Sequence, residues 1–478
     1  MERAGGKCVE WIEKYCFSGK QFTIFCGKGN NGGDGLAIAR LLAEISCPVS
    51  LFILESGEKG SDDFEINLQR LQKFPAIVTA FIKSEKDFPK PIPHEVVIDA
   101  LFGSGLNRPL EGIAAKLVGH INHSGCEIIS IDIPSGLFID QSSKGNPVVQ
   151  ATHTLSFQCY KLGFLLPENA KAVGNVHILN IGLHPQFIKD ISCIYELVDE
   201  DLIINIYKAR TPFAHKGNFG HAALVAGSTW MMGAAILCAR ACLRSGAGKL
   251  TCYVSKSGYE IMQTSVPEAM SIISGAKDFI ENADGLSLFD SVAVGPGIGL
   301  IENNAKLVKN VLQQCKKPVV IDADALNILA ANQALLMELP PYSILTPHKK
   351  EFERLFGKST NDFEQIALAQ QKAKELNVVI VLKGHHSFIA VPSGTGYFNN
   401  TGNAGMAKGG SGDVLTGIIA ALLAQHYSAE HAAVLGVYLH GIAGDLAAEK
   451  FSQEAMVAGD MINCLGEVFK RMAKYPSY

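Results

Sequence analysis

The sequence predicts an α/β protein of two successive domains, each built on a mainly parallel sheet. Short β-branched runs alternate with helical periods along most of the chain, which is typical of βαβ units. Two glycine-rich loops, at 27–35 and 402–413, each follow a strand-like run and lead into a helix-like segment. The 478 residues suffice for two to four domains at roughly 100–200 residues each. We therefore expect two separate sites, one at each loop.

The first domain is expected over residues 1–195 as a Rossmann-like three-layer α/β/α domain. The alternation of strand-like and helix-like segments predicts a parallel sheet with helices on both faces. The expected strands cover 22–26, 49–54, 77–81, 96–99, 128–132, 151–156 and 175–179. The expected helices cover the N-terminal stretch to Cys16, 36–45, 64–74 and 114–124.

A turn-rich, irregular stretch at 182–209 is expected to join the two domains, and the second α/β domain is expected over 205–478. Its expected strands cover 221–227, 250–254, 291–294, 318–321, 343–345 and 378–382, followed by a hairpin at 386–391 and 396–399. Its expected helices cover 232–245, 414–425, 429–450 and 457–474. The two halves do not resemble each other.

Composition narrows the class of protein. The net charge is −4, from 42 basic and 46 acidic residues, so nothing favours a nucleic acid or an anionic membrane as partner. The longest apolar runs are shorter than the ~18 residues that span a bilayer, and the first residues do not form a signal-peptide core. The 12 cysteines are scattered, which favours reduced thiols. A cytoplasmic enzyme is expected.

The first glycine-rich loop has the spacing of a dinucleotide fingerprint at Gly27, Gly29 and Gly32, and Glu55 lies about where a ribose-binding acid would stand. This spacing alone is weak evidence. Asn30, Asn31 and Asp34 bring amide and carboxylate oxygens into the loop, where a pyrophosphate would prefer N–H groups.

Two further strand ends carry similar polar loops, one after Asp99 and one around Asp132. The carboxyl ends of strands in a doubly wound sheet meet in one crevice. Asn31, Asp99 and Ser135 would then combine one carboxylate with neutral oxygens, a set that suits a monovalent cation better than a divalent one. Asp132 would remain available for acid–base chemistry. The alternative is that these residues only form tight turns and helix caps.

The second loop combines an anion nest at Gly410–Asp413 with a carboxylate at a helix start. Asp413 could take a proton from a hydroxyl that attacks phosphorus, or it could serve only as a helix cap. The loop does not have the Walker spacing. A Gly-x-Gly-Asp motif late in the chain resembles the ribokinase-like phosphotransferases, which implies a ribokinase-like α/β fold for the second domain.

The loops of the first half resemble those of NAD(P)H-hydrate epimerase domains, through the segments 29–35, 99–105 and 132–136. The resemblance implies that hydrated NAD(P)H is surrounded by Asn30, Asn31, Gly32, Gly33, Asp34, Gly103, Ser104, Gly105, Leu106, Asn107, Arg108 and Pro109. It also implies that Asp132 contacts this substrate as the acid–base residue and that Asn31, Asp99 and Ser135 bind K⁺. That family usually carries a further helix-bearing stretch before the part that matches 1–5, so we expect the first helix to be missing or the start to be truncated.

An ordered series of motifs in the second half resembles the ADP/ATP-dependent NAD(P)H-hydrate dehydratase: the segments 215–220, 227–235, 243–248, 266–270, 295–299, 322–326, 346–348 and 382–384. The resemblance implies that Ala234, Gly297, His348 and Asp413 bind hydrated NAD(P)H. It implies an adenine-nucleotide site made by Lys383, Gly384, His385, His386, Ser387, Asn403, Ala404, Gly405, Met406, Ala407, Lys408, Gly409, Gly410, Ser411 and Gly412. Lys350 stands where that family more often has glycine.

Some assignments stay open at this point. Asp322 and Asp324 could be caps or could reach a Mg²⁺–phosphate region, while His440 and Asp445 are expected to be structural. Together the two resemblances imply a bifunctional repair enzyme that epimerises hydrated NADH and NADPH and then dehydrates the S epimer. Its co-substrate would be ADP or ATP with Mg²⁺, and a homo-oligomer is expected. The rivals are a vitamin-precursor or sugar kinase fused to a nucleotide-binding module, and a non-catalytic first half.

Overall fold

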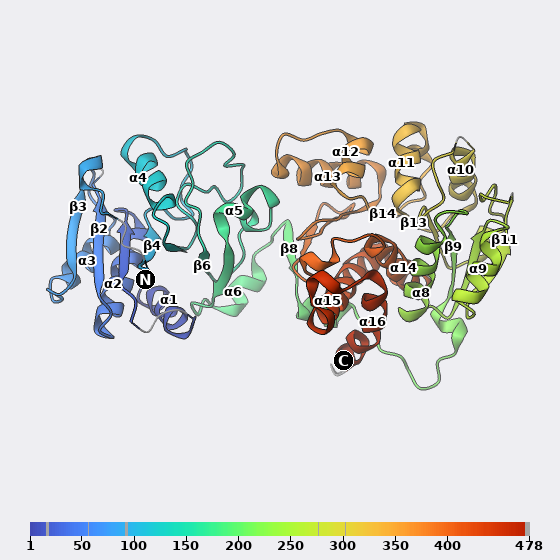
Figure 1. Cartoon of the computed structure of the whole chain (residues 1–478), viewed down its shortest axis with the longest axis horizontal. Helices are drawn as coiled ribbons and strands as arrows, with labels where there is room; N and C mark the ends of the chain where they lie inside the picture. Colours follow the sequence, from blue (N-terminus) through green and yellow to red (C-terminus); the bar gives the residue numbers. More distant parts are fainter. Residues whose placement is uncertain (16–18, 56, 91–93, 276, 302, 474–478) are drawn as a thin grey trace. The chain divides into compact units, whose positions relative to one another are not determined.

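The computed structural model describes residues 1–15, 19–55, 57–90, 94–275, 277–301 and 303–473. The chain forms two compact units (Figure 1). The first comprises Met1–Ser192 with Asn361–Phe363, and the second comprises Cys193–Thr360 and Glu364–Tyr478. Both are α/β units, as predicted.

The first unit contains one seven-stranded parallel sheet in the order β3-β2-β1-β4-β5-β6-β7. The strands are β1 (Phe22–Cys26), β2 (Val49–Leu54), β3 (Val78–Ile82), β4 (Val96–Ala100), β5 (Glu127–Ile131), β6 (His153–Phe157) and β7 (Asn175–Leu179). The helices are α1 (Glu2–Tyr15), α2 (Asn30–Glu44), α3 (Asp62–Leu71), α4 (Gly112–Asn122), α5 (Ala170–Val173) and α6 (Pro185–Asp190).

Alternate residues of the central strands face two separate apolar cores. Ile24 and Ile98 pack with α1, α2 and α3 on one face, whereas Phe25 and Val97 pack with α4 on the other. Successive strand side chains point to opposite faces, so the continuous apolar runs in the sequence reflect a sheet that is buried on both sides.

The second unit contains a ten-stranded sheet in the order β11-β10-β9-β12-β13-β14-β15-β16-β17-β8. Pairing is parallel from β11 to β15, antiparallel across β15-β16-β17, and parallel between β17 and β8. The strands are β8 (Tyr195–Val198), β9 (His221–Val225), β10 (Lys249–Val254), β11 (Met270–Ile273), β12 (Ser291–Val294), β13 (Val319–Ile321), β14 (Ile344–Leu345), β15 (Val379–Leu382), β16 (Phe388–Ala390) and β17 (Gly396–Asn399).

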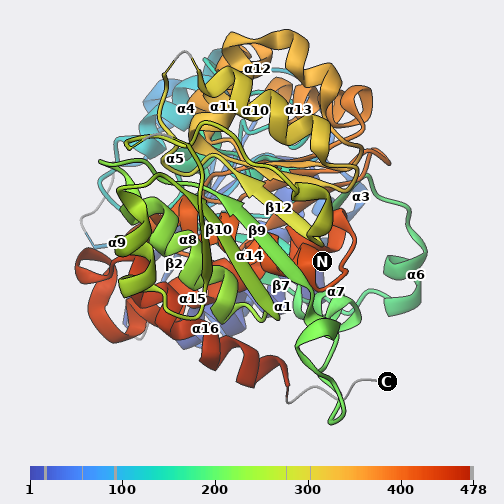
Figure 2. The same ribbon diagram turned by 90° about the vertical axis from the view of Figure 1, so that its right-hand side faces the viewer.

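Helices cover both faces of this sheet (Figure 2). One large apolar core joins the sheet to α8, α14, α15 and α16, while α10, α11 and α12 lie on the opposite side. The helices are α7 (Glu200–Ile206), α8 (Met232–Arg244), α9 (Gly258–Ser265), α10 (Asn304–Gln314), α11 (Ala323–Ala331), α12 (Lys349–Phe356), α13 (Asp362–Leu376), α14 (Ser411–Ala424), α15 (Ala429–Ala455) and α16 (Ala458–Met472). Among the described residues, none of the helices is long and apolar enough to cross a membrane.

The structure differs from the sequence-based expectations in a few places. The stretch 182–209 is not irregular, because it contains α6, β8 and α7. The helix α2 begins at Asn30 and not at residue 36, since its first turn is the glycine-rich loop itself. A Cβ on Gly32 would lie 1.7 Å from the carbonyl oxygen of Gly27, so the close approach of strand end and helix requires glycine. The expected helix ends at Cys16 and Lys474 lie outside the described residues.

Candidate active sites

The polar loops of the first unit follow β1, β4 and β5, which are neighbours in the sheet. The register pairs Cys26 with Ala100 and Asp99 with Ser130. From β1 the chain continues outward to β2 and β3 on one side, and from β4 it continues outward to β5, β6 and β7 on the other. The β1–β4 pair is therefore the topological switch point, where α/β sheets bind ligands. The loops therefore meet at the same edge of the sheet.

Asp99 is completely buried at this edge of the sheet. The hydroxyl of Ser135 donates to its Oδ1 at 2.6 Å, while the Ser135 N–H and the Ser130 hydroxyl donate to its Oδ2 at 2.9 and 2.8 Å. Burial raises the pKa of Asp99, and these hydrogen bonds act in the opposite direction. The structure thus brings together two of the three residues expected to bind a cation.

Asn31 lies close to the same loops. It is 7% exposed, and neither its Oδ1 nor its Nδ2 has a hydrogen-bond partner among the described residues. A Cβ on Gly103 would lie 3.2 Å both from the Asn31 Cβ and from the Asp132 Oδ2. A buried amide left without partners is costly, so this side chain points to a ligand. Its oxygen, with the Asp99 and Ser135 oxygens nearby, fits a monovalent cation.

Asp132 stands directly after β5 with a left-handed backbone, at φ +66°. Its Oδ2 accepts the Ser104 N–H at 3.1 Å, and its Oδ1 forms an ion pair with Lys161 Nζ at 2.8 Å. Both side chains are only 14% exposed. The ion pair with Lys161 was not foreseen, because nothing in the sequence connects positions 132 and 161.

The other residues expected around this site are distributed unevenly. Burial and the Asp132 carboxylate raise the pKa of Asp34 to about 7, so this side chain belongs to the same cluster. In contrast, Gly105, Asn107, Arg108 and Pro109 are exposed on the loop that follows β4. Glu55 forms an ion pair with Lys28, which explains the position of the Glu55 side chain without a ribose ligand.

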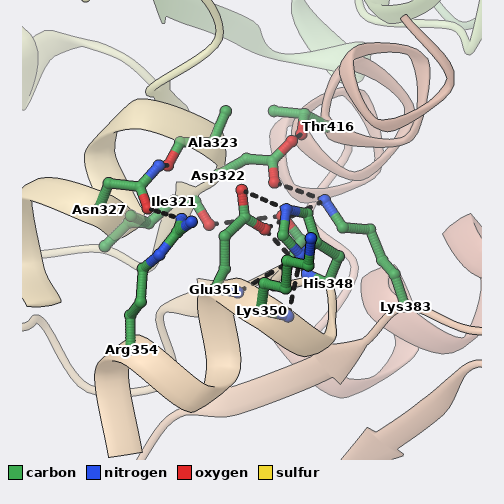
Figure 3. Close-up of polar contacts among 11 residues, drawn as sticks. Ile321, Asp322, Ala323, Asn327, His348, Lys350, Glu351, Arg354, Lys383 and Thr416 are labelled. Atoms are coloured by element: carbon green, nitrogen blue, oxygen red, sulfur yellow. Dashed lines mark hydrogen bonds and ion pairs between the residues drawn. The ribbon is translucent and has the colours of Figure 1, made fainter. Parts of the chain in front are cut away.

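The site of the second unit is assembled from strand ends and the start of α14 (Figure 3). Asp322 follows β13 and is almost fully buried. Its Oδ1 accepts the Lys383 Nζ at 2.8 Å, and its Oδ2 accepts the Thr416 hydroxyl at 2.7 Å. The Asp322 side chain makes no cap hydrogen bond to α11, so the interpretation as a helix cap is wrong. Asp324 accepts the Gly299 N–H at 2.8 Å.

Asp413 lies in the first turn of α14, whose N-cap residue is Gly410 at φ +91°. Burial, together with the Asp322 carboxylate, raises the pKa of Asp413 to about 6, although Lys383 acts against this. A Cβ on the neighbouring Gly412 would lie 3.3 Å from Lys383 Nζ. The arrangement places a lysine, a carboxyl group with a raised pKa and glycine N–H groups at one helix N-terminus, which suits phosphoryl transfer.

The expected substrate residues of this unit occupy two places. Gly297 adopts φ +65°, and a Cβ there would lie 3.2 Å from Ala234 Cβ, so these two residues meet. His348 is half exposed and caps α12, because its Nδ1 accepts the N–H groups of Lys350 and Glu351. Lys350 is exposed in the first turn of that helix, so its side chain fits where glycine was expected.

The expected nucleotide loop packs against α15. Asn403 Oδ1 accepts the Gly405 N–H at 3.0 Å, and a Cβ on Gly405 would lie 2.6 Å from Met456 Sδ. Lys408 donates to the carbonyl oxygens of Glu454 and Met456. In the turn between β15 and β16, Ser387 Oγ donates to the Gly384 carbonyl at 3.3 Å. Within the described residues, no group of three or more His, Cys, Asp or Glu side chains could hold a metal ion.

Comparison with known proteins decides the family. A family model described as NAD(P)H-hydrate dehydratase matches residues 222–466, and one described as YjeF-related protein N-terminus matches residues 1–163. A bifunctional NAD(P)H-hydrate repair enzyme of Moorella thermoacetica is 36% identical over 490 residues, covering 99% of this chain and 92% of the relative. The chain belongs to the bifunctional NAD(P)H-hydrate repair enzyme family.

Further relatives agree with this NAD(P)H-hydrate repair family. The bifunctional repair enzyme of Thermofilum pendens is 35% identical, covering 99% of this chain and 92% of its own. The crystal structure of the ADP/ATP-dependent NAD(P)H-hydrate dehydratase from Bacillus subtilis, co-crystallised with ATP/Mg²⁺, is 31% identical and matches with a TM-score of 0.50 over 58% of this chain and 98% of that one. A ribokinase-like protein of Enterococcus faecalis matches with a TM-score of 0.52 at 27% identity, over 60% of this chain and 99% of that one. The predicted α/β fold and bifunctional enzyme class are confirmed.

Two residues expected to be structural lie against the loop that is expected to bind the nucleotide in this NAD(P)H-hydrate repair protein. The Asp445 carboxylate accepts the Gly402 N–H and the Asn403 Nδ2, both at 2.9 Å. His440 Nε2 lies 3.0 Å from the Ser411 carbonyl oxygen. Burial lowers the pKa of His440 to about 4, so its ring is neutral and donates to that carbonyl. Both residues hold the loop from α15.

We expect Asp445→Ala to raise the KM for ADP or ATP about tenfold. The change removes two hydrogen bonds of roughly 0.5–1.5 kcal/mol each from the loop, and each 1.4 kcal/mol corresponds to about a tenfold change in affinity. Initial rates of NADH formation at varied nucleotide concentration measure it. Glu449→Ala, at an exposed position on the same helix, is the control. An unchanged KM in the Asp445 variant would contradict this role for the carboxylate.

The pKa of Asp413 also predicts a pH profile. Only the ionised carboxylate can accept a proton, so log kcat/KM for dehydration should rise with pH up to about 6, the value for Asp413, and level off above it. Rates between pH 4.5 and 8 would measure this, with the protein confirmed to be folded at each pH. A profile that is flat from pH 5 to 7 would show that this carboxyl group is not the base.

Proposed function

We propose that the first unit interconverts the R and S epimers of hydrated NADH and NADPH, and that the second unit removes water from the S epimer. The observation that carries the second activity is the half-buried Asp413 carboxylate beside Lys383 and the glycine-rich helix start. The ionic cluster around Asp132 and the unpartnered Asn31 amide support the first activity. Both proposals agree with the family to which the chain belongs.

Dehydration needs a better leaving group than hydroxide. In the proposed step, Asp413 takes the proton of the substrate's C6 hydroxyl. The hydroxyl oxygen attacks the terminal phosphorus of ADP or ATP at the same time. The nucleotide leaves as AMP or ADP. Loss of phosphate from C6 and of a proton from C5 to solvent then restores the C5=C6 double bond of the dihydropyridine ring. The N–H groups at the start of α14 and the Lys383 ammonium would stabilise charge on the transferred group. Mg²⁺, when bound, would neutralise charge on the phosphates of the nucleotide.

The remaining assignments are proposed on the same basis. Residues 383–387 and 403–412 would hold the adenine nucleotide, and K⁺ would bind the oxygens of Asn31, Asp99 and Ser135. Replacing K⁺ by Li⁺ should then slow epimerisation and leave dehydration of the S epimer unchanged apart from any general salt effect. The cytoplasmic location and the homo-oligomer stay predictions from the sequence.

A test of the second activity follows the purified S epimer with Mg²⁺ and either ADP or ATP. We expect NADH absorbance to appear with one phosphate released per NADH formed. A phosphorylated product that persists, with no gain of NADH absorbance, would instead indicate a kinase.

A further inference from the structure

Trp230 and Phe279 form an aromatic pair at the carboxyl ends of the strands of the second unit. Trp230 lies in the turn between β9 and α8 and is 77% exposed. The half-buried Phe279, in the loop after β11, packs against it edge to face with 6.2 Å between ring centroids. The pair presents apolar ring surface beside the strand ends that carry the proposed dehydratase site, and such surface is suited to a planar ligand.

Hydrogen bonds between three strand ends hold the backbone next to this aromatic pair. The Thr229 N–H donates to the Asp278 carbonyl oxygen at 3.0 Å, and the Thr229 hydroxyl donates to the Asp278 carboxylate at 2.8 Å. Ser257, after β10, places its Oγ 2.7 Å from the same hydroxyl. Because Trp230 directly follows Thr229 and Phe279 directly follows Asp278, both rings start from a fixed backbone, which reduces the entropy lost when a ligand binds.

The loop after β12 connects the aromatic pair to the expected substrate residues. A Cβ on Gly299 would lie 3.7 Å from Met231 Cε and 3.8 Å from Phe279 Cε1. A Cβ on Gly297 would lie 2.9 Å from Met231 Cβ and 3.2 Å from Ala234 Cβ. Gly297 and Ala234 are the residues expected to bind the hydrate, so the aromatic pair extends that surface without a break.

The strand order places the aromatic pair and the expected nucleotide residues on opposite sides of Asp413. Trp230 follows β9, whereas Asp322, whose carboxylate acts on Asp413, follows β13, two strands away. Neighbouring strands lie about 4.8 Å apart, so the ends of β9 and β13 are separated by about 10 Å. The expected nucleotide residues follow β15 and β17, beyond β13 in the other direction. A ligand on the aromatic pair would therefore approach Asp413 from the side opposite the nucleotide.

Two buried polar groups in the same loops lack partners. Ser228 has no exposed surface, and its hydroxyl has no hydrogen-bond partner among the described residues. The same holds for Asn304 Oδ1, although Asn304 Nδ2 donates to the carbonyl oxygens of Ile298 and Gly299 at 3.0 and 2.7 Å. Unpaired buried polar atoms cost free energy, so these two groups, like the exposed rings, indicate a ligand at these loops.

We propose that Trp230 and Phe279 bind the adenine ring of the hydrated dinucleotide and thereby position its hydrated ring at Asp413. This inference rests on the proposed dehydratase function. The hydrated ring has a tetrahedral C6 and must lie at the phosphoryl-transfer residues, whereas adenine is the planar aromatic ring at the other end of the same molecule. The two riboses and the pyrophosphate between the rings are long enough to span two strand spacings. Hydrated NADH and hydrated NADPH both carry adenine, so the aromatic pair serves both.

The kinetic test compares hydrated NADH with hydrated reduced nicotinamide mononucleotide, which lacks the adenine half. Both are supplied to the full chain as S epimers with Mg²⁺ and ADP or ATP. Trp230→Ala should raise the KM for hydrated NADH about 10- to 100-fold, the range that stacking of a base on an aromatic side chain contributes. The kcat and the KM for ADP or ATP should change less than about threefold, because the lost contact is equally strong in the ground state and the transition state. The KM for the mononucleotide should be the same in the variant and in wild type.

Two variants serve as comparisons. Trp230→Phe keeps an aromatic ring and should recover most of the wild-type KM for hydrated NADH. Phe213→Ala removes a 98% exposed aromatic side chain of the same unit, and it should leave every KM unchanged.

Tryptophan fluorescence measures binding without turnover. The chain has two tryptophans, and the other one, Trp11, lies in α1 of the first unit. In a Trp11→Phe variant without ADP or ATP, hydrated NADH should quench the emission of Trp230 to saturation, and the mononucleotide should leave most of it.

Four results would overturn the inference. They are an unchanged KM for hydrated NADH in Trp230→Ala, an equal rise in KM for the hydrate with and without adenine, a rise in the KM for ADP or ATP instead, and no quenching of Trp230. A change of oligomeric state in Trp230→Ala with every KM unchanged would assign the aromatic pair to a second copy of the chain and would overturn it as well. Absence of NADH formation by wild type would instead overturn the proposed function itself.

Discussion

Asp413→Asn is expected to lower kcat for dehydration by about 10²–10⁴-fold, which is the usual contribution of a positioned general base. The substitution preserves the shape of the side chain beside Lys383 and Asp322, so the KM values for the hydrate and the nucleotide should change less than about threefold. Epimerisation by the first unit should be unaffected. NADH formation from the pure S epimer measures the loss, and a variant that retains more than a tenth of the wild-type kcat would contradict the role of Asp413 as base.

The same substitution is expected to stabilise the second unit at neutral pH. The folded pKa of Asp413 is about 6, above the ordinary value of 3.8, so the unfavourable cost of ionising it in the folded state is absent below about pH 4 and fully present above about pH 6. Each pKa unit corresponds to 1.36 kcal/mol, and removing the charge should therefore raise the stability above pH 6 by about 1–3 kcal/mol. Asn at this position carries no such cost at any pH, so its advantage over wild type disappears below about pH 4.

Thermal unfolding at pH 5 and at pH 7.5 separates the two contributions. The midpoint of the Asp413→Asn variant should exceed that of wild type more at pH 7.5 than at pH 5. Asp290→Asn is the matched control in the same unit: burial alone would raise the pKa of Asp290, but hydrogen bonds from Lys317 and the His221 N–H outweigh it and lower that pKa. This control should lose stability at pH 7.5, and a loss of stability in the Asp413 variant would contradict the assigned shift.

Asp132→Asn should lower kcat for epimerisation by about 10²–10⁴-fold and leave dehydration of the S epimer unchanged. Asn is the suitable replacement because Asp132 has φ +66°, and Asn tolerates the left-handed region better than most residues. Lys161 loses its partner, so some loss of stability in the first unit is expected as well. Asp140→Asn, at an exposed carboxylate of the same unit, is the control. Unimpaired epimerisation in the Asp132 variant would favour a non-catalytic first unit.

The central strands could be predicted from the sequence because burial on both faces produces continuous apolar runs. The expected bounds of β1, β2, β7, β12 and β17 agree with the structure. In contrast, β8 was missed because its partner β17 lies about 200 residues further along the chain, and a four-residue strand has little pattern of its own. The start of α2 was placed too late because glycine and asparagine have low helix propensity, which the tight packing of Gly32 on Gly27 overrides.

In the candidate sites, too, some features could be predicted from the sequence and others could not. Loops at the ends of adjacent parallel strands could be foreseen to meet, and Asp99, Ser135 and Asp132 do lie with Asn31 and Ser104. The partners of these side chains could not be foreseen, because Lys161 reaches Asp132 only through the order of β5 and β6 in the sheet. Asp445 likewise reaches the expected nucleotide loop only because α15 packs on it. Spacing in sequence carries no information on such contacts.

The central claim is that one chain repairs both epimers of the damaged nucleotide. The most direct test gives wild-type protein an equilibrated mixture of R and S hydrated NADH with ADP or ATP, Mg²⁺ and K⁺, and follows NADH absorbance to completion faster than the epimers interconvert without protein. Recovery of NADH from the whole mixture by wild type, and from the S fraction alone by the Asp132→Asn variant, is the predicted result. Persistence of both epimers with either nucleotide would contradict the account.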